Sequence, residues 1–116
     1  MIGAERGPRA ALRAELIERG LDAIGFETLR DAVLAGRLPG ALRPALVVID
    51  LHEQPVDDRL LDALFAAGAP VVAVAGAAEA GDARLRGRPW ARWLRRPLTL
   101  GAIADVAAAA STIGGD

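Results

Sequence analysis

The sequence predicts a doubly wound α/β fold, in which helices cover both faces of a parallel sheet of four to five strands. Two continuous apolar runs, at residues 44–51 and 70–75, are typical of strands that are buried on both faces. Segments with helical periodicity alternate with these runs, and the connections between them are brief. Because crossovers between parallel strands are right-handed, a small doubly wound sheet is the economical topology.

The first half of the chain predicts two helices and little strand. Only residues 1–6 precede the first helix, so the first strand is expected to be short or absent. Good helix formers fill residues 9–19, and Gly20 is placed to end that helix. Residues 21–26 are short and partly apolar, and Thr-Leu-Arg-Asp at residues 28–31 is a capping-box pattern that opens a second helix.

The second half continues the alternation of helix and strand. Asp57 and Asp58 place negative charge at the start of a third helix, which Gly68 ends. Residues 77–88 show a weaker helical pattern and predict a short, poorly anchored helix. Residues 90–94 are the candidate last strand.

A final helix follows Thr99, which offers an N-cap. Its apolar residues recur at the i, i+3, i+4 and i+7 positions of a helical face, which are Leu100, Ile103, Ala104 and Ala107. We expect one domain over residues 1–110 and a flexible tail over residues 111–116.

The composition limits the classes of partner. Hydrophobic residues make up 53% of the chain and aromatic residues only 3%, so the core is built largely from Ala, Leu, Val and Ile. The formal net charge of −1 offers no basic field for nucleic acid or for an anionic membrane surface. The amino-terminal residues lack the apolar region of a signal peptide, and no run is long enough to span a bilayer. We therefore expect a cytoplasmic protein with neither nucleic acid nor a membrane as partner.

Asp50 closes the first apolar run and is the leading candidate for a functional residue. In open parallel sheets, ligands and chemistry are found at the carboxyl ends of the strands. A plainer role is also open, in which the carboxylate only ends the strand and accepts backbone hydrogen bonds. His52, the single histidine, is interpreted as a solvated loop residue. The chain has no Cys, which excludes thiolate chemistry, and all its basic residues are Arg.

Four segments of the chain from residue 45 onward match those of a known protein family in composition and order. They are residues 45–51, the leucine-rich helix that follows, Gly-Ala-Pro-Val-Val-Ala-Val at residues 68–74, and residues 94–100. Together they resemble the receiver domain of two-component response regulators, over roughly the whole chain and most specifically from residue 45 to residue 109. The resemblance implies a flavodoxin-like fold and a role in phosphorelay signal transduction. It also implies a protein partner: a histidine kinase, an output domain or a second copy of the chain.

The resemblance assigns roles to particular positions. In that family the aspartate that closes the third strand accepts a phosphoryl group, and this position corresponds to Asp50. An acidic pair after the first strand holds Mg²⁺ in the family. Here the pair would fall between Gly3 and Arg6, where only Glu5 is acidic.

Further family positions carry other residue types here. A Ser or Thr that contacts the phosphoryl group corresponds to Ala75 or Gly76, and a Lys that neutralises its charge corresponds to Arg96. Trp93 stands where the family usually has an aromatic residue whose orientation reports activation. Ala75 and Trp93 are therefore the expected switch positions.

The loop after Asp50 also departs from the pattern, since Pro55 lies one residue farther along and Arg59 replaces the usual Gly. These losses favour a degenerate receiver, or pseudo-receiver. Mg²⁺ held only by Glu5 and Asp50 should bind weakly. We therefore expect no cofactor, and no enzymatic activity beyond at most autophosphorylation and dephosphorylation at Asp50.

Three functions remain open at this point. The favoured one is a degenerate receiver-like module that signals by protein–protein interaction without phosphoryl transfer. The second is a functional phospho-acceptor that is phosphorylated on Asp50 with Mg²⁺. The third is a small flavodoxin-like domain that binds a nucleotide or another cofactor, although no Gly-rich phosphate fingerprint follows a strand.

Two expectations concern the end of the chain. The resemblance implies a cis peptide bond before Pro97, with Arg96 directed toward Asp50, where it can pair with the carboxylate. The last strand is expected at a sheet edge and carries both Trp residues, which predicts an interface, in a symmetric dimer or with another protein. The predicted interface residues are Trp90, Trp93, Ile103 and Ala107.

Overall fold

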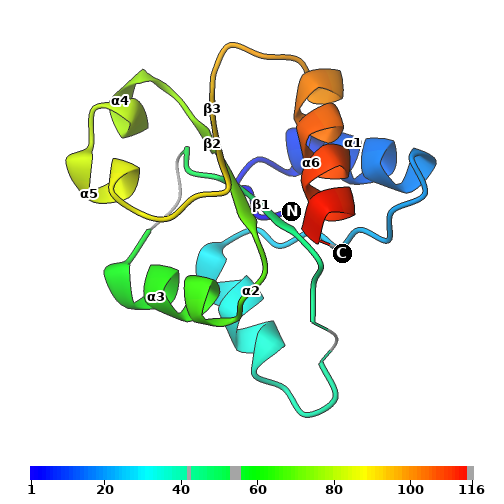
Figure 1. The fold of residues 1–116 in the computed structure, drawn as a ribbon, viewed down its shortest axis with the longest axis horizontal. Helices are drawn as coiled ribbons and strands as arrows, with labels where there is room; N and C mark the ends of the chain where they lie inside the picture. The colour runs from blue at the N-terminus through cyan, green and yellow to red at the C-terminus, as the bar shows by residue number, and fades with distance from the viewer. Residues whose placement is uncertain (42, 53–55, 115–116) are drawn as a thin grey trace.

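Three parallel strands form the sheet at the centre of the molecule (Figure 1). The computed structural model describes residues 1–41, 43–52 and 56–114. The strands are β1 (Val47–Asp50), β2 (Val71–Ala75) and β3 (Arg92–Arg95), and they lie side by side in that order. The two apolar runs of the sequence are thus β1 and β2, and every residue of both strands is buried, as predicted.

The predicted first strand is reduced to a single residue. Ile2 forms isolated parallel bridges to Ile49 on one side and to Phe26 on the other. Its N–H donates to the carbonyl of Val48 at 2.8 Å, and its carbonyl accepts from the N–H of Asp50 at 2.7 Å. The first helix begins almost at once, so the chain leaves the sheet after this contact. The expected four to five strands are therefore corrected to three strands, extended by one-residue bridges.

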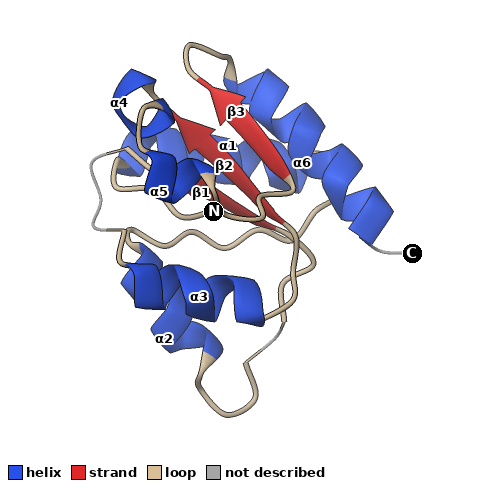
Figure 2. Cartoon of the chain, turned by 60° about the vertical axis from the view of Figure 1, so that its left-hand side comes forward, coloured by secondary structure: helices blue, strands red, loops and turns tan. Residues whose placement is uncertain are grey.

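Helices cover both faces of this sheet. Their bounds are α1 Arg6–Glu18, α2 Leu29–Gly36, α3 Asp58–Ala66, α4 Ala77–Ala80, α5 Ala83–Arg86 and α6 Leu100–Gly114. In Figures 1 and 2, α1 and α6 lie together on one face, while α2 and α3 lie together on the other. The doubly wound α/β architecture predicted from the sequence is confirmed.

Each face of the sheet has its own core, because successive strand residues point to opposite faces. Val72 and Val74 of β2 pack toward α1 and α6, whereas Ala73 and Ala75 pack toward α2 and α3. The first core contains Leu12, Leu16, Val48, Val72, Val74, Ile103, Ala104 and Ala107. The second core is built mainly from Ile2, Leu29, Val33, Val47, Ile49, Leu51, Leu61, Leu64, Val71 and Leu85.

Side chains cap the starts of three helices, at Thr28 and Thr99 as predicted and also at Asp57. Thr28 Oγ1 accepts from the N–H of Asp31 at 3.1 Å, and Asp57 Oδ1 accepts from the N–H of Arg59 at 2.7 Å. Thr99 caps α6 in the same way. Each such cap satisfies a backbone donor that the helix itself cannot pair, and contributes about 1 kcal/mol.

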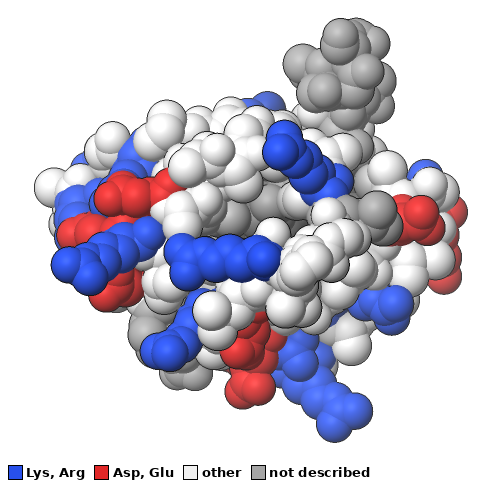
Figure 3. Space-filling view, turned by 90° about the horizontal axis from the view of Figure 1, so that it is seen from below, with Lys and Arg blue, Asp and Glu red and all other residues white. Residues whose placement is uncertain are grey.

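The weak segment at residues 77–88 forms two single-turn helices, α4 and α5, and not the single helix that we predicted. The segment is also better anchored than expected. Asp58 Oδ1 of α3 accepts hydrogen bonds from Arg84 Nη1 at 2.9 Å and from Arg88 Nη2 at 2.8 Å. Arg88 also pairs with Asp62. The face seen in Figure 3 shows acidic and basic side chains interspersed, with no field of one sign.

The last strand starts two residues later than predicted. Trp90 precedes β3, its indole Nε1 donates to the carbonyl of Leu85 at 2.7 Å, and its ring meets Phe65 edge-on at a centroid distance of 5.0 Å. Trp90 thus ties the segment before β3 to α5 and α3. A tryptophan with these contacts serves packing, because its apolar body and its polar N–H are both satisfied within the chain.

α6 runs to Gly114, past the predicted domain boundary at residue 110. The remainder of the expected tail, residues 115 and 116, lies outside the described residues. Among the helices that the structure describes, none is long and apolar enough to cross a membrane.

Candidate functional site

Asp50 lies at the carboxyl edge of the sheet, as the last residue of β1, and is only 9% exposed. Each oxygen of its carboxylate accepts a hydrogen bond. Oδ1 accepts a hydrogen bond from the N–H of His52 at 3.0 Å, and Oδ2 accepts one from Arg96 Nη2. A buried carboxylate is costly unless it is paired and hydrogen-bonded, and here both conditions are met.

Arg96 reaches Asp50 from the segment that follows β3. Its backbone N–H donates to the carbonyl of Ala75 at 2.8 Å, which extends the pairing of β3 with β2 by one residue. The peptide bond between Arg96 and Pro97 is cis, and the guanidinium pairs with Asp50, so both expectations are confirmed. The Asp50 side chain is 12% exposed and that of Arg96 is 39% exposed. The pair therefore joins a buried anion to a cation that still faces solvent.

Gly3, and not an acidic residue, lies beside Asp50. A Cβ atom built on Gly3 would lie 3.6 Å from the Cβ of Asp50. Glu5 is the exposed N-cap of α1, where its side chain makes no capping hydrogen bond. Across the described ranges, no group of three or more His, Asp and Glu side chains is arranged to hold a metal ion. The protein ligands that Mg²⁺ favours are carboxylates, so the surroundings of Asp50 are a poor match to this ion.

The position that carries a Ser or Thr in the resembled family has no hydroxyl group here, because Ala75 and Gly76 stand there. Glu79 of α4 turns toward this position instead. The N–H of Gly76 donates to Glu79 Oε2 at 3.0 Å, and His52 Nδ1 lies 3.4 Å from Glu79 Oε1. This link joins the loop after β1 to the loop after β2. Sequence reasoning missed it, because His52 and Glu79 are far apart in the chain and follow no motif.

The Glu79 link makes part of the stability depend on pH. The pKa of Glu79 is lowered mainly by a hydrogen bond from its own backbone N–H, and further by His52 and the N–H of Gly76, against the opposing effect of burial. The folded protein therefore holds fewer protons here than the unfolded chain. This carboxylate stabilises the fold above the ordinary glutamate pKa of about 4.3, and that stabilisation is lost as the pH falls through the lowered pKa.

We expect Glu79→Gln to weaken this acid dependence. Between about pH 5 and pH 3, the free energy of unfolding of the variant should fall less steeply than that of the wild type. Urea unfolding at a series of pH values measures both slopes. Glu18→Gln, at an exposed position on α1, is the matched control and should keep the wild-type slope. Identical slopes for all three proteins would contradict the role given to Glu79.

The predicted interface residues do not form one patch. Trp93 is partly buried on the α3 side of the sheet, with its ring centroid 5.9 Å from that of Trp90. Ile103 and Ala107 lie on the opposite side, at 3% and 0% exposure, within the core that α6 shares with α1. Their helical spacing marks the buried face of α6. The interface hypothesis is corrected accordingly: Ile103 and Ala107 are core residues.

Comparison with known proteins bears on the fold. The sequence matches no protein-family model and no curated protein sequence. Among solved structures, the receiver domain of NtrX from Brucella abortus superposes with a TM-score of 0.75 at 20% identity. The match covers 96% of this chain and 95% of that one.

Two further structures give the same result. A response regulator receiver protein from Pseudomonas putida has a TM-score of 0.72 at 22% identity, over 93% of this chain and 92% of that one. The N-terminal domain of a response regulator/sensory box/GGDEF 3-domain protein from Carboxydothermus hydrogenoformans has a TM-score of 0.76 at 16% identity, over 97% and 91%. The chain therefore has a receiver-like flavodoxin fold with a three-stranded parallel sheet.

Proposed function

We propose that this chain is a degenerate receiver-like signalling module that acts through protein–protein interaction without phosphoryl transfer. The observation that carries the proposal is the Arg96–Asp50 pair. Both carboxylate oxygens of Asp50 already accept hydrogen bonds, from His52 N–H and from Arg96. The carboxylate that would attack a phosphoryl group is thus neutralised by a side chain of the same protein.

The physical argument concerns charge. Phosphoryl transfer is catalysed mainly by positioning and by neutralising the transferred oxygens, chiefly through a metal ion. The described residues around Asp50 form no acidic cluster for such an ion. Arg96 compensates one negative charge of Asp50 without any phosphoryl group or metal ion. The domain is therefore held in a charge-neutralised arrangement that does not depend on phosphate, and no enzymatic activity or resident cofactor is needed for its role.

Partners of this module are proposed to be proteins. A receiver-like fold occurs as the N-terminal domain of the three-domain protein from Carboxydothermus hydrogenoformans. By analogy, a histidine kinase, an output domain or a second copy of this chain are the candidates.

Within the described residues β3 pairs only with β2, which leaves its other edge open, with Arg92 and Arg95 exposed along it. An open edge of this kind is where we place the partner contact, and the net charge of −1 argues against nucleic acid.

Metal binding tests the proposal. Mn²⁺ serves as a paramagnetic substitute for Mg²⁺, because it broadens the NMR signals of nearby amides. At millimolar Mn²⁺ we expect the amides at the end of β1 to broaden no more in the wild type than in Asp50→Asn. Saturable broadening at Ile49, Asp50 and Leu51 that disappears in Asp50→Asn would favour the alternative, a functional phospho-acceptor with a metal at Asp50.

A further inference from the structure

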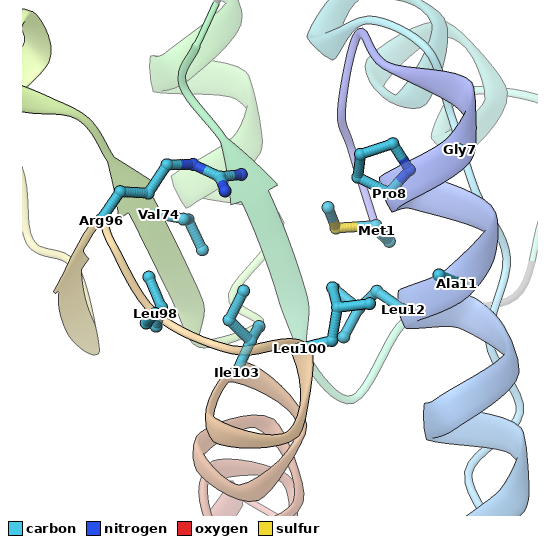
Figure 4. Close-up of a pocket in the computed structure, with 10 residues that line it drawn as sticks. All are labelled: Met1, Gly7, Pro8, Ala11, Leu12, Val74, Arg96, Leu98, Leu100 and Ile103. Atoms are coloured by element: carbon cyan, nitrogen blue, oxygen red, sulfur yellow. The ribbon is translucent and has the colours of Figure 1, made fainter.

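A cavity of about 390 Å³ opens between the start of α1, the end of β2 and the segment that leads from β3 into α6 (Figure 4). Its walls are apolar. The main contributors are Met1, Leu12, Val74, Leu98, Leu100 and Ile103. Its volume falls within the range of about 300–1,000 Å³ that is usual for pockets that hold small molecules, which are mostly apolar with a few placed polar groups.

Arg96 supplies the charged group of this cavity. Figure 4 shows its side chain running past Val74 at the rim of the cavity, with the guanidinium pointing toward the side where Met1 and Pro8 lie. Nη2 donates to Asp50. A guanidinium carries further N–H donors on Nε and on its other terminal nitrogen, and its planar fork can serve two carboxylates at once. The 39% exposure of the Arg96 side chain leaves room for such a second acceptor.

We propose that this cavity binds a small amphiphilic carboxylate, with its alkyl chain among the apolar walls and its carboxylate against the guanidinium of Arg96. The argument is one of complementarity in both shape and charge. An uncharged alkane would offer the exposed edge of the guanidinium no opposite charge, and a cation would be repelled by it. The nearby carboxylate of Asp50 opposes the incoming anion, so the affinity is modest and lies in the millimolar to high-micromolar range.

Occupancy of the cavity is linked to the candidate site, because Arg96 belongs to both. A carboxylate on the outer edge of the guanidinium competes with Asp50 for its charge. If the module signals without phosphate, as proposed above, this competition gives it a chemical input, and that regulatory step rests on the proposed function. The binding site itself does not depend on whether Asp50 is phosphorylated.

Titration with octanoate, followed by amide NMR shifts, tests the proposal. We expect saturable shifts in residues 98–103, and binding weaker by about tenfold or more for octanol and octylammonium, which keep the chain but lose the carboxylate. Arg96→Gln should weaken octanoate binding by a similar factor. Arg30→Gln removes an exposed arginine from α2, on the other face of the sheet, and should leave binding unchanged. Ala11→Phe fills the cavity from the exposed side of α1 and should abolish binding, while its amide spectrum reports that it remains folded.

Either of two results would overturn the proposal. One is the absence of saturation up to about 10 mM octanoate, a limit at which even very weak sites fill. The other is equal binding of octanoate and octanol together with unchanged affinity in Arg96→Gln, which would indicate an apolar groove that does not recognise carboxylates. A protein that accepts phosphate on Asp50 and still binds octanoate would refute the proposed function and leave this site intact.

Discussion

Replacing Arg96 by Met is expected to lower the free energy of unfolding by about 1–3 kcal/mol, because it leaves the buried carboxylate of Asp50 without its charged partner. Loss of one member of a fully buried ion pair costs about 3–5 kcal/mol. The smaller figure applies here because the Arg96 side chain is 39% exposed, so that water already screens part of the pair. Met has an unbranched side chain that replaces the aliphatic part of Arg96, so the substitution removes mainly the charge and its hydrogen bond.

Chemical denaturation of the purified variants measures this effect. Arg92→Met is the matched control, since Arg92 is an exposed arginine of β3, and it should change stability by less than about 0.5 kcal/mol. Adding Asp50→Asn to Arg96→Met should recover much of the loss, because the double variant no longer buries an unpaired charge. Equal losses in Arg96→Met and Arg92→Met would show that the pair contributes nothing, and the neutralised-site account would fail.

The central part of the fold is predictable because its signals are local. β1 and β2 lie within short apolar runs, which are typical of strands buried on both faces. Thr28, Asp57 and Thr99 mark helix starts through hydrogen bonds to residues that follow closely in the chain. Such patterns need no knowledge of distant partners.

The edges of the fold are less predictable because distant contacts decide them. Ile2 joins the sheet through Val48, Asp50 and Phe26, and the sequence of the first residues does not predict those partners. The segment at residues 77–88 is likewise held by ion pairs to α3 and by the indole of Trp90. These contacts stabilise a segment whose own helical signal is weak.

In the candidate site, too, the residues that follow a sequence pattern were predicted and the contacts between distant residues were not. Asp50 and Arg96 were found because each sits at a recognisable position in a family pattern, and the structure brings them together. The link between His52 and Glu79 was missed because it follows no pattern. Ile103 and Ala107 were misjudged for the opposite reason. Their helical spacing identifies an apolar face but does not say whether that face meets the same chain or another one, and here it meets the same chain.

The largest expected effect is an all-or-none result at Asp50. Its two oxygens are occupied by Arg96 and by the N–H of His52, and the described surroundings supply no acidic cluster to bring a metal ion to an incoming phosphoryl group. Without that ion, the transferred oxygens lack their main source of charge neutralisation. We therefore expect no stable acyl phosphate to form at this position.

Intact-mass spectrometry after incubation with acetyl phosphate and Mg²⁺ tests this claim most directly. A receiver domain that is known to accept phosphate, treated in the same buffer, verifies the donor, and Asp50→Asn defines the background. The account predicts that the wild type keeps its unmodified mass, as Asp50→Asn does. A wild-type mass increased by one phosphoryl group, with no such increase in Asp50→Asn, would contradict it and identify the domain as a working phospho-acceptor.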